Sequence, residues 1–437
     1  MRSQGCTCYR FPGATALLLF ALVFSLAQGS APAQGLLTNA PDWTFAAEFQ
    51  LRSDRDSRDF ASATDAFGFT TLRTRAGIQR SINPNIHFFV QLQDARLLGT
   101  APNSLANTAN VDVHQAFLQI DSLFSLPLYV QAGRLTLSYG TERFVGATDW
   151  NFVGRSFDGA RLALRQGGLT VDAFSTLLRE SDPFVGIAVP GIASGAGDMR
   201  MSGLWGEYTV EPGHKITAFS LLENDARIDN NGNCLLNRLT AGVNYGGDIG
   251  GLHLLFEAAY QTGEQSLEDR LLDIAAYVAS LRLAYDFGDI AAFAQLDLLS
   301  GAAQNTDGPA DEIGTIALPY GTNHKFYGYM DYFIDIPVNT AGRGLNDALL
   351  GLVWRPDDGD FSATLHAHHM TANRSAAEQA ETYGQELDVI LTYGLAAKTK
   401  LSLGGSVFVA GDLMERLFDV ADPDPSLWAY LMLTAQI

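Results

Sequence analysis

The chain has 437 residues, of which 47% are hydrophobic, and it carries a formal net charge of -20 at pH 7. So acidic a protein repels the phosphate backbone, which argues against nucleic acid as a partner. The length alone would allow two or three soluble domains, but the patterns along the chain indicate a single unit of another class.

The N-terminus has the three parts of a secretory signal peptide. Two arginines precede an apolar run at residues 14–27, and small residues follow in the sequence QGSAPAQ. The apolar run is shorter than the roughly 20 residues that a membrane-spanning helix needs. We therefore expect residues 1–33 to be a signal peptide, cleaved after residue 29 or 33, and the mature protein to be exported.

Beyond this segment, apolar and polar residues alternate with a period of two. In residues 252–260 the even-numbered positions are Leu, Leu, Phe, Ala and Tyr, and residues 238–245 and 426–437 alternate in the same way. A period of two places the apolar side chains on one face of a β-strand. About ten residues per strand suits a tilted strand that crosses a membrane, so the pattern predicts transmembrane β-strands.

The connections between these strands alternate in length. The short turns are residues 81–85, 121–127, 166–168, 211–214, 246–251, 286–289, 355–360 and 394–399. The longer polar stretches are residues 53–66, 97–110, 140–155, 179–199, 224–236, 263–271, 302–342, 371–382 and 411–425. Short turns at one end and long loops at the other are typical of bacterial outer-membrane barrels. Eight turns and nine loops join eighteen strands, so we predict an all-β fold, a transmembrane antiparallel β-barrel over residues 34–437 with both termini periplasmic.

Aromatic residues support this prediction, because strands that lead into short turns carry one on the apolar face near the turn. They are Tyr208, Tyr245, Tyr285, Trp354 and Tyr393. An aromatic girdle at a membrane interface needs this placement. A soluble β-sandwich would alternate too, but it has no reason to place aromatic residues at one end only.

Charge is unevenly distributed along the chain. Residues 34–165 hold 12 acidic residues and 12 arginines, whereas residues 166–437 hold 36 acidic and 14 basic residues. A lipid-facing arginine costs about 2–4 kcal/mol at mid-bilayer, so arginines on strands should face the lumen. Alternation places Arg73 and Arg75 there, and also Arg161 and Arg165.

Two interpretations of these arginines remain open. They could line a path for an anionic solute, since arginine suits bidentate contact with carboxylates and phosphates. Alternatively, they could pair with lumen carboxylates and brace a polar interior. The candidate carboxylates are Glu48, Asp158, Glu257, Glu386 and Asp388.

Several segments make the chain similar to the alginate export family of outer-membrane porins. These segments are residues 90–99, 113–121, 133–162, 256–263, 322–333 and 384–395. The most specific is GRLTLSYGTERFVGATDWNFVGRSFDGARL, residues 133–162. The resemblance implies an 18-stranded monomeric barrel with an arginine-rich lumen that passes an anionic polysaccharide outward. It nominates as path residues Arg73, Arg75, Arg96, Arg134, Arg143, Arg155 and Arg161; we add Arg165, Asp158, Glu257 and Lys325.

The expected function is thus a porin, without enzymatic activity, in the outer membrane of a Gram-negative bacterium. Its expected partners are membrane lipid, an anionic polysaccharide or small anionic solute, and periplasmic secretion proteins. One alternative is a diffusion porin, either general or for sugars and organic acids. Another is an outer-membrane barrel enzyme with a Ser–His pair on the lipid face; His114 falls on an apolar face, but no serine can be assigned to it.

The arginines of residues 133–165, together with Arg73, Arg75 and Arg96, are expected to form a positive strip down one side of the lumen. The acidic surplus would then lie on loops, turns and the opposite wall. This arrangement predicts anion preference that weakens at high salt. Replacing Arg134 and Arg161 by Glu should lower it.

The long connection 302–342 contains the sequence TNHKFYGYMDYF. Loops of this length in compact proteins are usually functional. We expect it to fold over or into the extracellular mouth, with Lys325 and the tyrosines ordered against the wall, so its deletion should raise single-channel conductance.

Metal-binding patterns are incomplete in the sequence. His366 and His368 share a lumen face and could begin a metal site, but no third ligand can be identified. The acidic stretches 54–59 and 355–360 could bind calcium but have the composition of ordinary loops. We therefore expect no cofactor.

Overall fold

The computed structural model describes residues 43–57, 66–100, 111–180, 197–302, 312–357, 359–374, 381–420 and 423–436. The predicted signal peptide, residues 1–33, lies outside these ranges. Within them, no helix combines the length and the apolar character needed to cross a membrane.

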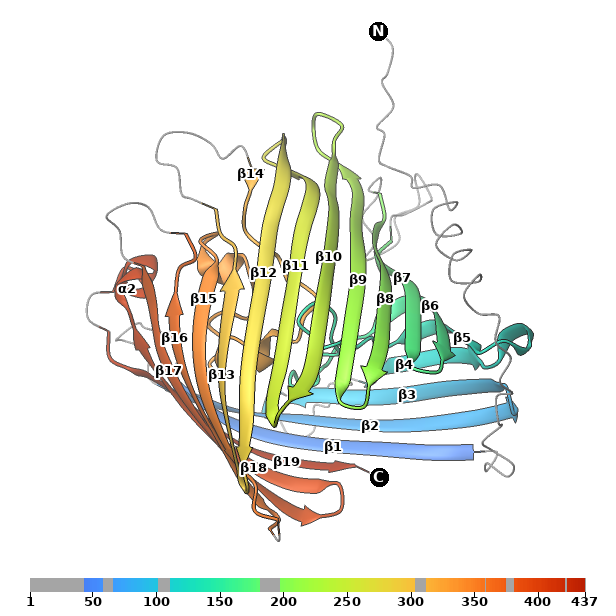
Figure 1. Cartoon of the computed structure of the whole chain (residues 1–437), viewed down its shortest axis with the longest axis horizontal. Helices are drawn as coiled ribbons and strands as arrows, with labels where there is room; N and C mark the ends of the chain where they lie inside the picture. Colours follow the sequence, from blue (N-terminus) through green and yellow to red (C-terminus); the bar gives the residue numbers. More distant parts are fainter. Residues whose placement is uncertain are drawn as a thin grey trace.

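Eighteen long antiparallel strands form a closed barrel, as predicted (Figure 1). They are β1 (Trp43–Asp56), β2 (Phe67–Asn83), β3 (Ile86–Leu97), β4 (Val111–Ile120), β5 (Leu128–Leu135), β6 (Phe157–Gln166), β7 (Leu169–Arg179), β8 (Met199–Glu211), β9 (His214–Ile228), β10 (Cys234–Ile249), β11 (Leu252–Leu267), β12 (Arg270–Phe287), β13 (Ile290–Leu299), β15 (Leu345–Trp354), β16 (Phe361–Thr371), β17 (Thr382–Ala396), β18 (Thr399–Ala410) and β19 (Ser426–Gln436).

Pairing between β1 and β19 closes the barrel, with Glu48 opposite Gln436. A two-residue strand, β14 (Glu312–Ile313), pairs in parallel with β12 and does not interrupt the ring, because β13 pairs directly with β15. The helices are short: η1 (Leu123–Ser125), η2 (Asn323–Lys325), η3 (Val338–Thr340) and α2 (Asp412–Phe418). Trp43 at the start of β1 pairs with Arg80, just before the short turn between β2 and β3. Gln436 at the end of β19 donates to the Lys398 carbonyl in the short turn before β18. The start of β1 and the end of β19 therefore lie at the end of the barrel that carries the short turns.

All eight predicted short turns are present, but two predicted long loops are wrong. Residues 224–236 contain only a five-residue connection, 229–233, and residues 263–271 contain a two-residue turn at Glu268 and Asp269. Asp229 caps the first connection by accepting hydrogen bonds from the backbone of Asn231 and Asn233, both at 2.8 Å. Glu268 and Asp269 have φ of 50° and 61°, as in a tight hairpin turn. The polar residues mistaken for loops belong to strands that extend β9–β12 at the long-loop end.

Side-chain alternation follows the prediction. On β10, Leu239 and Val243 are exposed on the outer face, whereas Arg238 and Thr240 are buried inside. The aromatic residues near the short turns also lie on the outer face, with Tyr208 51% and Trp354 41% exposed. An apolar outer band with aromatic residues at its rim suits a lipid bilayer.

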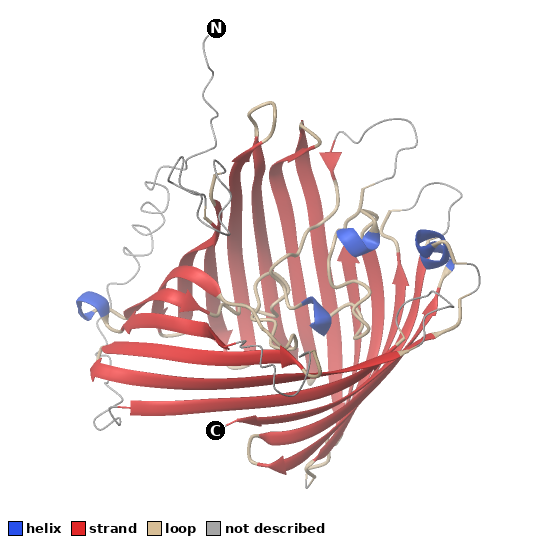
Figure 2. Cartoon of the chain, turned by 180° about the vertical axis from the view of Figure 1, so that it is seen from behind, coloured by secondary structure: helices blue, strands red, loops and turns tan. Residues whose placement is uncertain are grey.

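Two long connections fold into the space that the strands enclose (Figure 2). Inner loop 1 is residues 136–156, between β5 and β6; inner loop 2 is residues 314–344, between β14 and β15. Leu137 and Val145 of the first loop and Ile316 and Phe333 of the second are at most 1% exposed. The barrel therefore has an apolar core inside its lumen, contributed by the loops and not only by the strands.

A charge on the outer face should destabilise the barrel. Leu350 is 66% exposed in the middle of β15, opposite Ala294 of β13. We expect Leu350→Arg to lower the free energy of unfolding by about 2–4 kcal/mol, the range for an arginine in the hydrocarbon core. Denaturant unfolding in lipid vesicles measures this change.

The matched control is Gln295→Arg, on the strand next to β15 but on the lumen side, where Gln295 lines a cavity. We expect a much smaller loss for this variant because water solvates the new charge. Equal losses for the two variants would contradict the assignment of faces.

Candidate functional site

The two inner loops are joined by a close backbone contact. The Gly146 amide donates to the Tyr320 carbonyl at 2.9 Å, and the Thr322 amide donates to the Glu142 carbonyl at 2.8 Å. A Cβ on Gly146 would lie 2.1 Å from the Thr322 hydroxyl oxygen, so this approach requires glycine. The loops consequently behave as one unit.

Side chains reinforce the contact between the loops. Arg155 of inner loop 1 donates to the Gly321 and Pro319 carbonyls of inner loop 2, both at 3.2 Å. The rings of Trp150 and His324 stack with centroids 4.1 Å apart. Burial lowers the pKa of the Arg155 guanidinium, but carbonyl oxygens solvate the charge that it carries at neutral pH.

Arg143 fastens this unit to the far wall of the barrel. Its guanidinium donates to Glu257 of β11 at 2.8 Å, to Asp297 of β13 at 2.9 Å and to Ser280 of β12 at 3.1 Å. It also donates to the Tyr327 hydroxyl oxygen of inner loop 2 at 2.5 Å. The side chains of Arg143 and Glu257 are each only 2% exposed. We call Arg143 and these four partners the clasp.

Arg143 and Tyr327 of the clasp both have a raised pKa. Burial lowers the pKa of Arg143, but Asp297, Tyr327 and Glu257 outweigh it and raise that pKa well above its ordinary value. Burial likewise raises the pKa of Tyr327, with Arg143 opposing the shift. A group whose folded pKa is raised loses its stabilising contribution only as the pH passes above its unfolded pKa. Arg143 and Tyr327 therefore keep their protons at neutral pH.

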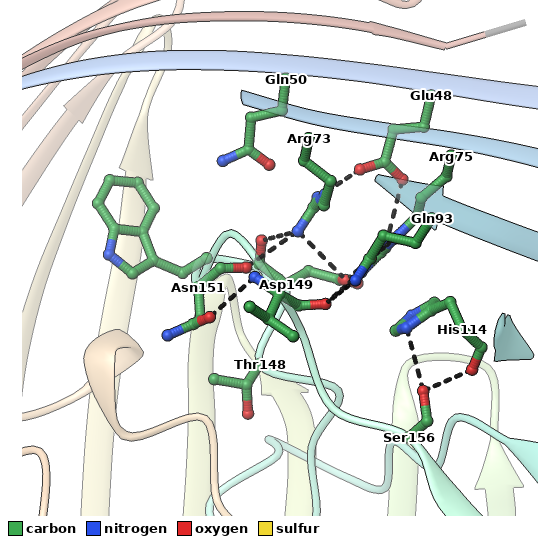
Figure 3. Close-up of polar contacts among 12 residues, drawn as sticks. Glu48, Gln50, Arg73, Arg75, Gln93, His114, Thr148, Asp149, Asn151 and Ser156 are labelled. Atoms are coloured by element: carbon green, nitrogen blue, oxygen red, sulfur yellow. Dashed lines mark hydrogen bonds and ion pairs between the residues drawn. The ribbon is translucent and has the colours of Figure 1, made fainter. Parts of the chain in front are cut away.

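The opposite side of inner loop 1 is held by β1–β3 (Figure 3). Arg73 donates to the Asp149 and Asn151 carbonyls, each at 3.0 Å, and forms an ion pair with Glu48. Arg75 donates to the Asp149 carboxylate at 2.9 Å. Both arginines face the lumen, as predicted, and the guanidinium groups of both bind inner loop 1.

Inner loop 2 is anchored to β15–β18. The Met330 amide donates to the Glu386 carboxylate at 2.8 Å, and the Tyr383 hydroxyl donates to the Thr340 carbonyl at 2.9 Å. Tyr332 packs on Phe408 with ring centroids 4.5 Å apart. This loop thus folds into the barrel with its tyrosines ordered, whereas Lys325 binds Glu142 of inner loop 1 at 2.7 Å and not the wall.

A cavity of about 710 Å³ lies between the inner loops and the barrel wall. Its wall includes Lys400 and Gln436, which lie near the short-turn end of the barrel. The basic groups in its lining are Arg73, Arg143, Arg282, Lys325 and Lys400. The acidic groups in its lining are Glu48, Glu142, Asp149 and Glu257. Among the residues that the structure describes, the lining thus holds four acidic side chains and five basic ones.

The predicted path residues divide into two groups. Those that line the cavity are Arg73, Arg143, Glu257 and Lys325. Those that do not line it are Arg75, Arg96, Arg134, Arg155, Arg161, Arg165 and Asp158. The sequence pattern therefore did not separate the arginines that line the cavity from those that lie elsewhere in the polar interior.

Most of the remaining predicted arginines are neutralised locally. The ion pairs are Arg96–Asp94, Arg134–Asp158 at 2.8 Å and Arg161–Asp172 at 3.8 Å. Arg165 donates to the Tyr129 hydroxyl oxygen at 2.9 Å. Carboxylates thus accompany the arginines on the same or adjacent strands, and the predicted bare positive strip is not confirmed.

Sequence analysis missed two cationic groups in the cavity, Arg282 and Lys400. Arg282 lies over the Phe293 ring, 3.5 Å from its centroid. Within the described ranges neither Arg282 nor Lys400 forms an ion pair. The signal that could have identified them is alternation, since Arg282 lies between Leu281 and Leu283, whose side chains are exposed on the outer face.

His114 does not lie on the lipid face, and this prediction was wrong. The register of β3 with β4 shifts between Gln91 and Leu92, so His114 is the extra residue of a β-bulge. The bulge turns its side chain into the lumen, where it is 5% exposed. Its Nδ1 lies 3.1 Å from the Ser156 hydroxyl, which donates to the His114 carbonyl at 2.6 Å (Figure 3).

This Ser–His pair lacks the third member of a catalytic triad among the described residues. His114 Nε2 has no hydrogen-bond partner there, so no carboxylate orients the ring. Nε2 is also buried and so kept from solvent. The pair belongs to the packing between β4 and inner loop 1.

The acidic stretch 54–59 offers no free calcium ligand at Asp54. One Asp54 oxygen accepts from Arg52 at 2.9 Å, and the other accepts from the Trp428 indole at 3.2 Å. Residues 58, 59 and 358 of the two acidic stretches lie outside the described ranges.

The clasp makes a specific prediction. Arg143→Met should lower the free energy of unfolding by about 3–5 kcal/mol, because Glu257 and Asp297 would stay buried without their cation. It should also free the inner loops and raise single-channel conductance. Denaturant unfolding and planar-bilayer recordings measure the two effects.

Lys325→Ala is the matched control, since it removes a cation from the same cavity. Lys325 is about half exposed, and an exposed ion pair contributes only about 0–1 kcal/mol. If Arg143→Met were no more destabilised than Lys325→Ala, the clasp would not hold the loops.

The chain was compared with protein families, curated proteins and solved structures. The chain matches the model of the Alginate export family over residues 42–333. None of the curated proteins searched matches the chain in sequence.

Solved outer-membrane structures share the fold. OccAB1 of Acinetobacter baumannii is 13% identical with a TM-score of 0.58, and the match covers 90% of this chain and 96% of that chain. For OccK8 (OprE) of Pseudomonas aeruginosa the values are 12%, 0.58, 91% and 98%. For OpdO of Pseudomonas aeruginosa they are 16%, 0.57, 90% and 97%. At such identities the likeness shows the fold alone.

The family match covers well over half of the chain and includes both β11–β13 and inner loop 1, which the clasp joins. The closed barrel, its apolar outer band and its two inward loops agree with that match. The chain therefore belongs to the alginate export family of outer-membrane porins.

Proposed function

We propose that this protein is a channel in the outer membrane of a Gram-negative bacterium that passes an anionic polysaccharide of the alginate type without catalysis. The observation that carries this proposal is the charge of the cavity. In a chain of net charge -20, its lining holds five basic and four acidic residues. The lining of the cavity is thus close to neutral, although the chain as a whole is strongly acidic.

The ion pairs show which charges a solute would meet. Arg143 pairs with Glu257 in the clasp, Arg73 pairs with Glu48, and Lys325 pairs with Glu142. Arg282 and Lys400 remain without an ion pair among the described residues. They offer cationic groups to a carboxylate that enters the cavity, and a guanidinium suits a carboxylate especially well.

A polyuronate carries one carboxylate per sugar unit, so a few weak cationic contacts suffice to guide it. Passage requires binding strong enough for entry and weak enough for release. Strong, unscreened arginine clusters would trap a polyanion. The pairing of most lumen arginines with carboxylates favours weak contacts.

A diffusion porin, general or for sugars and organic acids, is the alternative within the same class. Both functions need an open path past the inner loops, and they differ in the length of the solute. An enzymatic function finds no support in the Ser156–His114 pair, because His114 Nε2 has no partner in the described part of the chain.

Ion selectivity tests the proposal. The unaltered channel should prefer anions at low salt, and Arg282→Glu with Lys400→Glu should lower or reverse that preference. At 1 M salt the difference should largely vanish, because the Debye length falls to about 3 Å. Reversal potentials across planar bilayers under a KCl gradient give the measurement.

Lys398→Glu is the control for Lys400→Glu, because it makes the same single substitution in the turn before β18 and outside the cavity lining. It should leave selectivity nearly unchanged. A cation-selective unaltered channel would overturn the proposal.

Solute identity needs a second experiment. Oligouronates added to one side should block the current for longer as chain length grows, whereas neutral oligosaccharides of equal length should not. Equal effects of both would favour the diffusion porin.

A further inference from the structure

Four polar side chains of β16 and β17 meet in the lumen beside inner loop 2. In the register of these strands His366 lies opposite Asp388, and His368 lies opposite Glu386. The ligand atoms of His366, His368 and Asp388 all lie within 4.8 Å of one another. The third ligand that the sequence did not reveal is therefore supplied by the neighbouring strand.

A carboxylate behind the cluster fixes the orientation of His368. Its Nδ1 lies 2.8 Å and 3.1 Å from the two oxygens of Asp347 on β15. A hydrogen on Nδ1 donates to Asp347 and leaves the lone pair on Nε2, which faces Asp388 Oδ2 at 3.6 Å. This carboxylate–histidine arrangement is the one that orients histidine ligands in metal proteins.

Two carboxylate oxygens of these strands have no hydrogen-bond partner among the described residues. Asp388 Oδ2 and Glu386 Oε2 are both buried and lack a hydrogen bond. The other oxygen of Asp388 accepts from Ser406, and the other oxygen of Glu386 accepts from the Met330 amide at 2.8 Å. Asp388 is 1% and Glu386 2% exposed. A buried oxygen without a donor is costly and suits a cation.

The charges around the cluster also favour a bound cation. Asp347 and Asp388 each lie against His368, and Glu386 is the register partner of His368 on β17. All three carboxylates are buried, and no Arg or Lys forms an ion pair with any of them in the described ranges. Buried charge without compensation is strongly destabilising. A divalent cation would offset it.

The donor set identifies the class of metal. Two imidazoles with carboxylate oxygens suit Zn²⁺ or a similar first-row ion, whereas Ca²⁺ and Mg²⁺ prefer oxygen alone. Tetrahedral zinc with bonds of about 2.0–2.1 Å places its ligand atoms about 3.4 Å apart. The His368–Asp388 distance of 3.6 Å already agrees, and a small rotation of His366 would bring its nitrogen in.

We propose that His366, His368 and Asp388 bind a zinc-class divalent cation, with Glu386 as a fourth ligand and Asp347 orienting His368. His366 lines the cavity, so the ion can enter from it. Tyr329 packs on His366 with ring centroids 5.4 Å apart, and Met330 is bonded to Glu386. The bound ion holds this part of inner loop 2 against the wall.

Zinc titration of the untagged full-length protein tests the site. After dialysis against EDTA, calorimetry should show one high-affinity Zn²⁺ per chain, with no comparable signal from Ca²⁺ or Mg²⁺. Co²⁺ should give the intense visible absorption bands of tetrahedral coordination. Absence of stoichiometric zinc binding in the unaltered protein would overturn the proposal, and a proton shared by Glu386 and Asp388 would then account for the buried pair.

Variants locate the ion. His366→Ala and Asp388→Asn should weaken zinc binding by more than about 100-fold, and Asp347→Asn by about 10–100-fold as an outer-shell change. His369→Ala is the matched control, because His369 is the next residue on β16 and is exposed on its outer face. It should bind zinc as the unaltered protein does.

A surface histidine supplies the competing explanation. His253 lies at the short-turn end, 3.0 Å from Asp286, and is about half exposed. If His253→Ala removed the zinc signal and Asp388→Asn did not, the ion would be a surface ligand and the lumen site would be wrong. Heat denaturation of each variant without metal separates lost binding from lost folding.

Discussion

The structure depends on the pairing of β1 with β19, because a bilayer offers no hydrogen bonds to an open strand edge. Closure leaves no open edge in the wall, so neighbouring strands satisfy its backbone groups except at bulges, and each side chain faces either the lipid or the lumen. The outer face must be apolar, whereas the inner face is free to hold charge. The polar interior of this chain follows from that division, as does the need for its charges to find partners within the lumen.

Charged residues in the lumen act together with the apolar core to hold the inner loops in place. Arg73 and Arg75 hold inner loop 1 from one side of the ring, and Arg143 holds it from the other. Inner loop 2 then packs on inner loop 1 through backbone contacts that only glycine permits. The cavity is what remains between these fixed parts and the wall, so its shape depends on ion pairs as well as on apolar packing.

Local pattern was enough to predict the number of strands, their faces and the aromatic rim, because each depends on residues adjacent in sequence. It failed at His114, where one inserted residue in β4 reverses the faces. It also failed for the partners of Arg143, which lie 114 to 184 residues away. Those contacts depend on how far a loop reaches across a closed ring, and alternation does not encode that distance. Alternation could have placed Arg282 and Lys400 in the lumen. It could not have shown that they form no ion pair among the described residues.

Inner loop 1 touches three separate sectors of the wall. It contacts β2 through Arg73 and Arg75, β8 through the stack of Tyr139 on Trp205, and β11–β13 through Arg143. It is therefore a strut across the barrel. An empty tube of this width would yield to lateral pressure from the surrounding lipid and become oval. Here such flattening would have to break buried ion pairs, so inner loop 1 opposes a change in the cross-section of the pore.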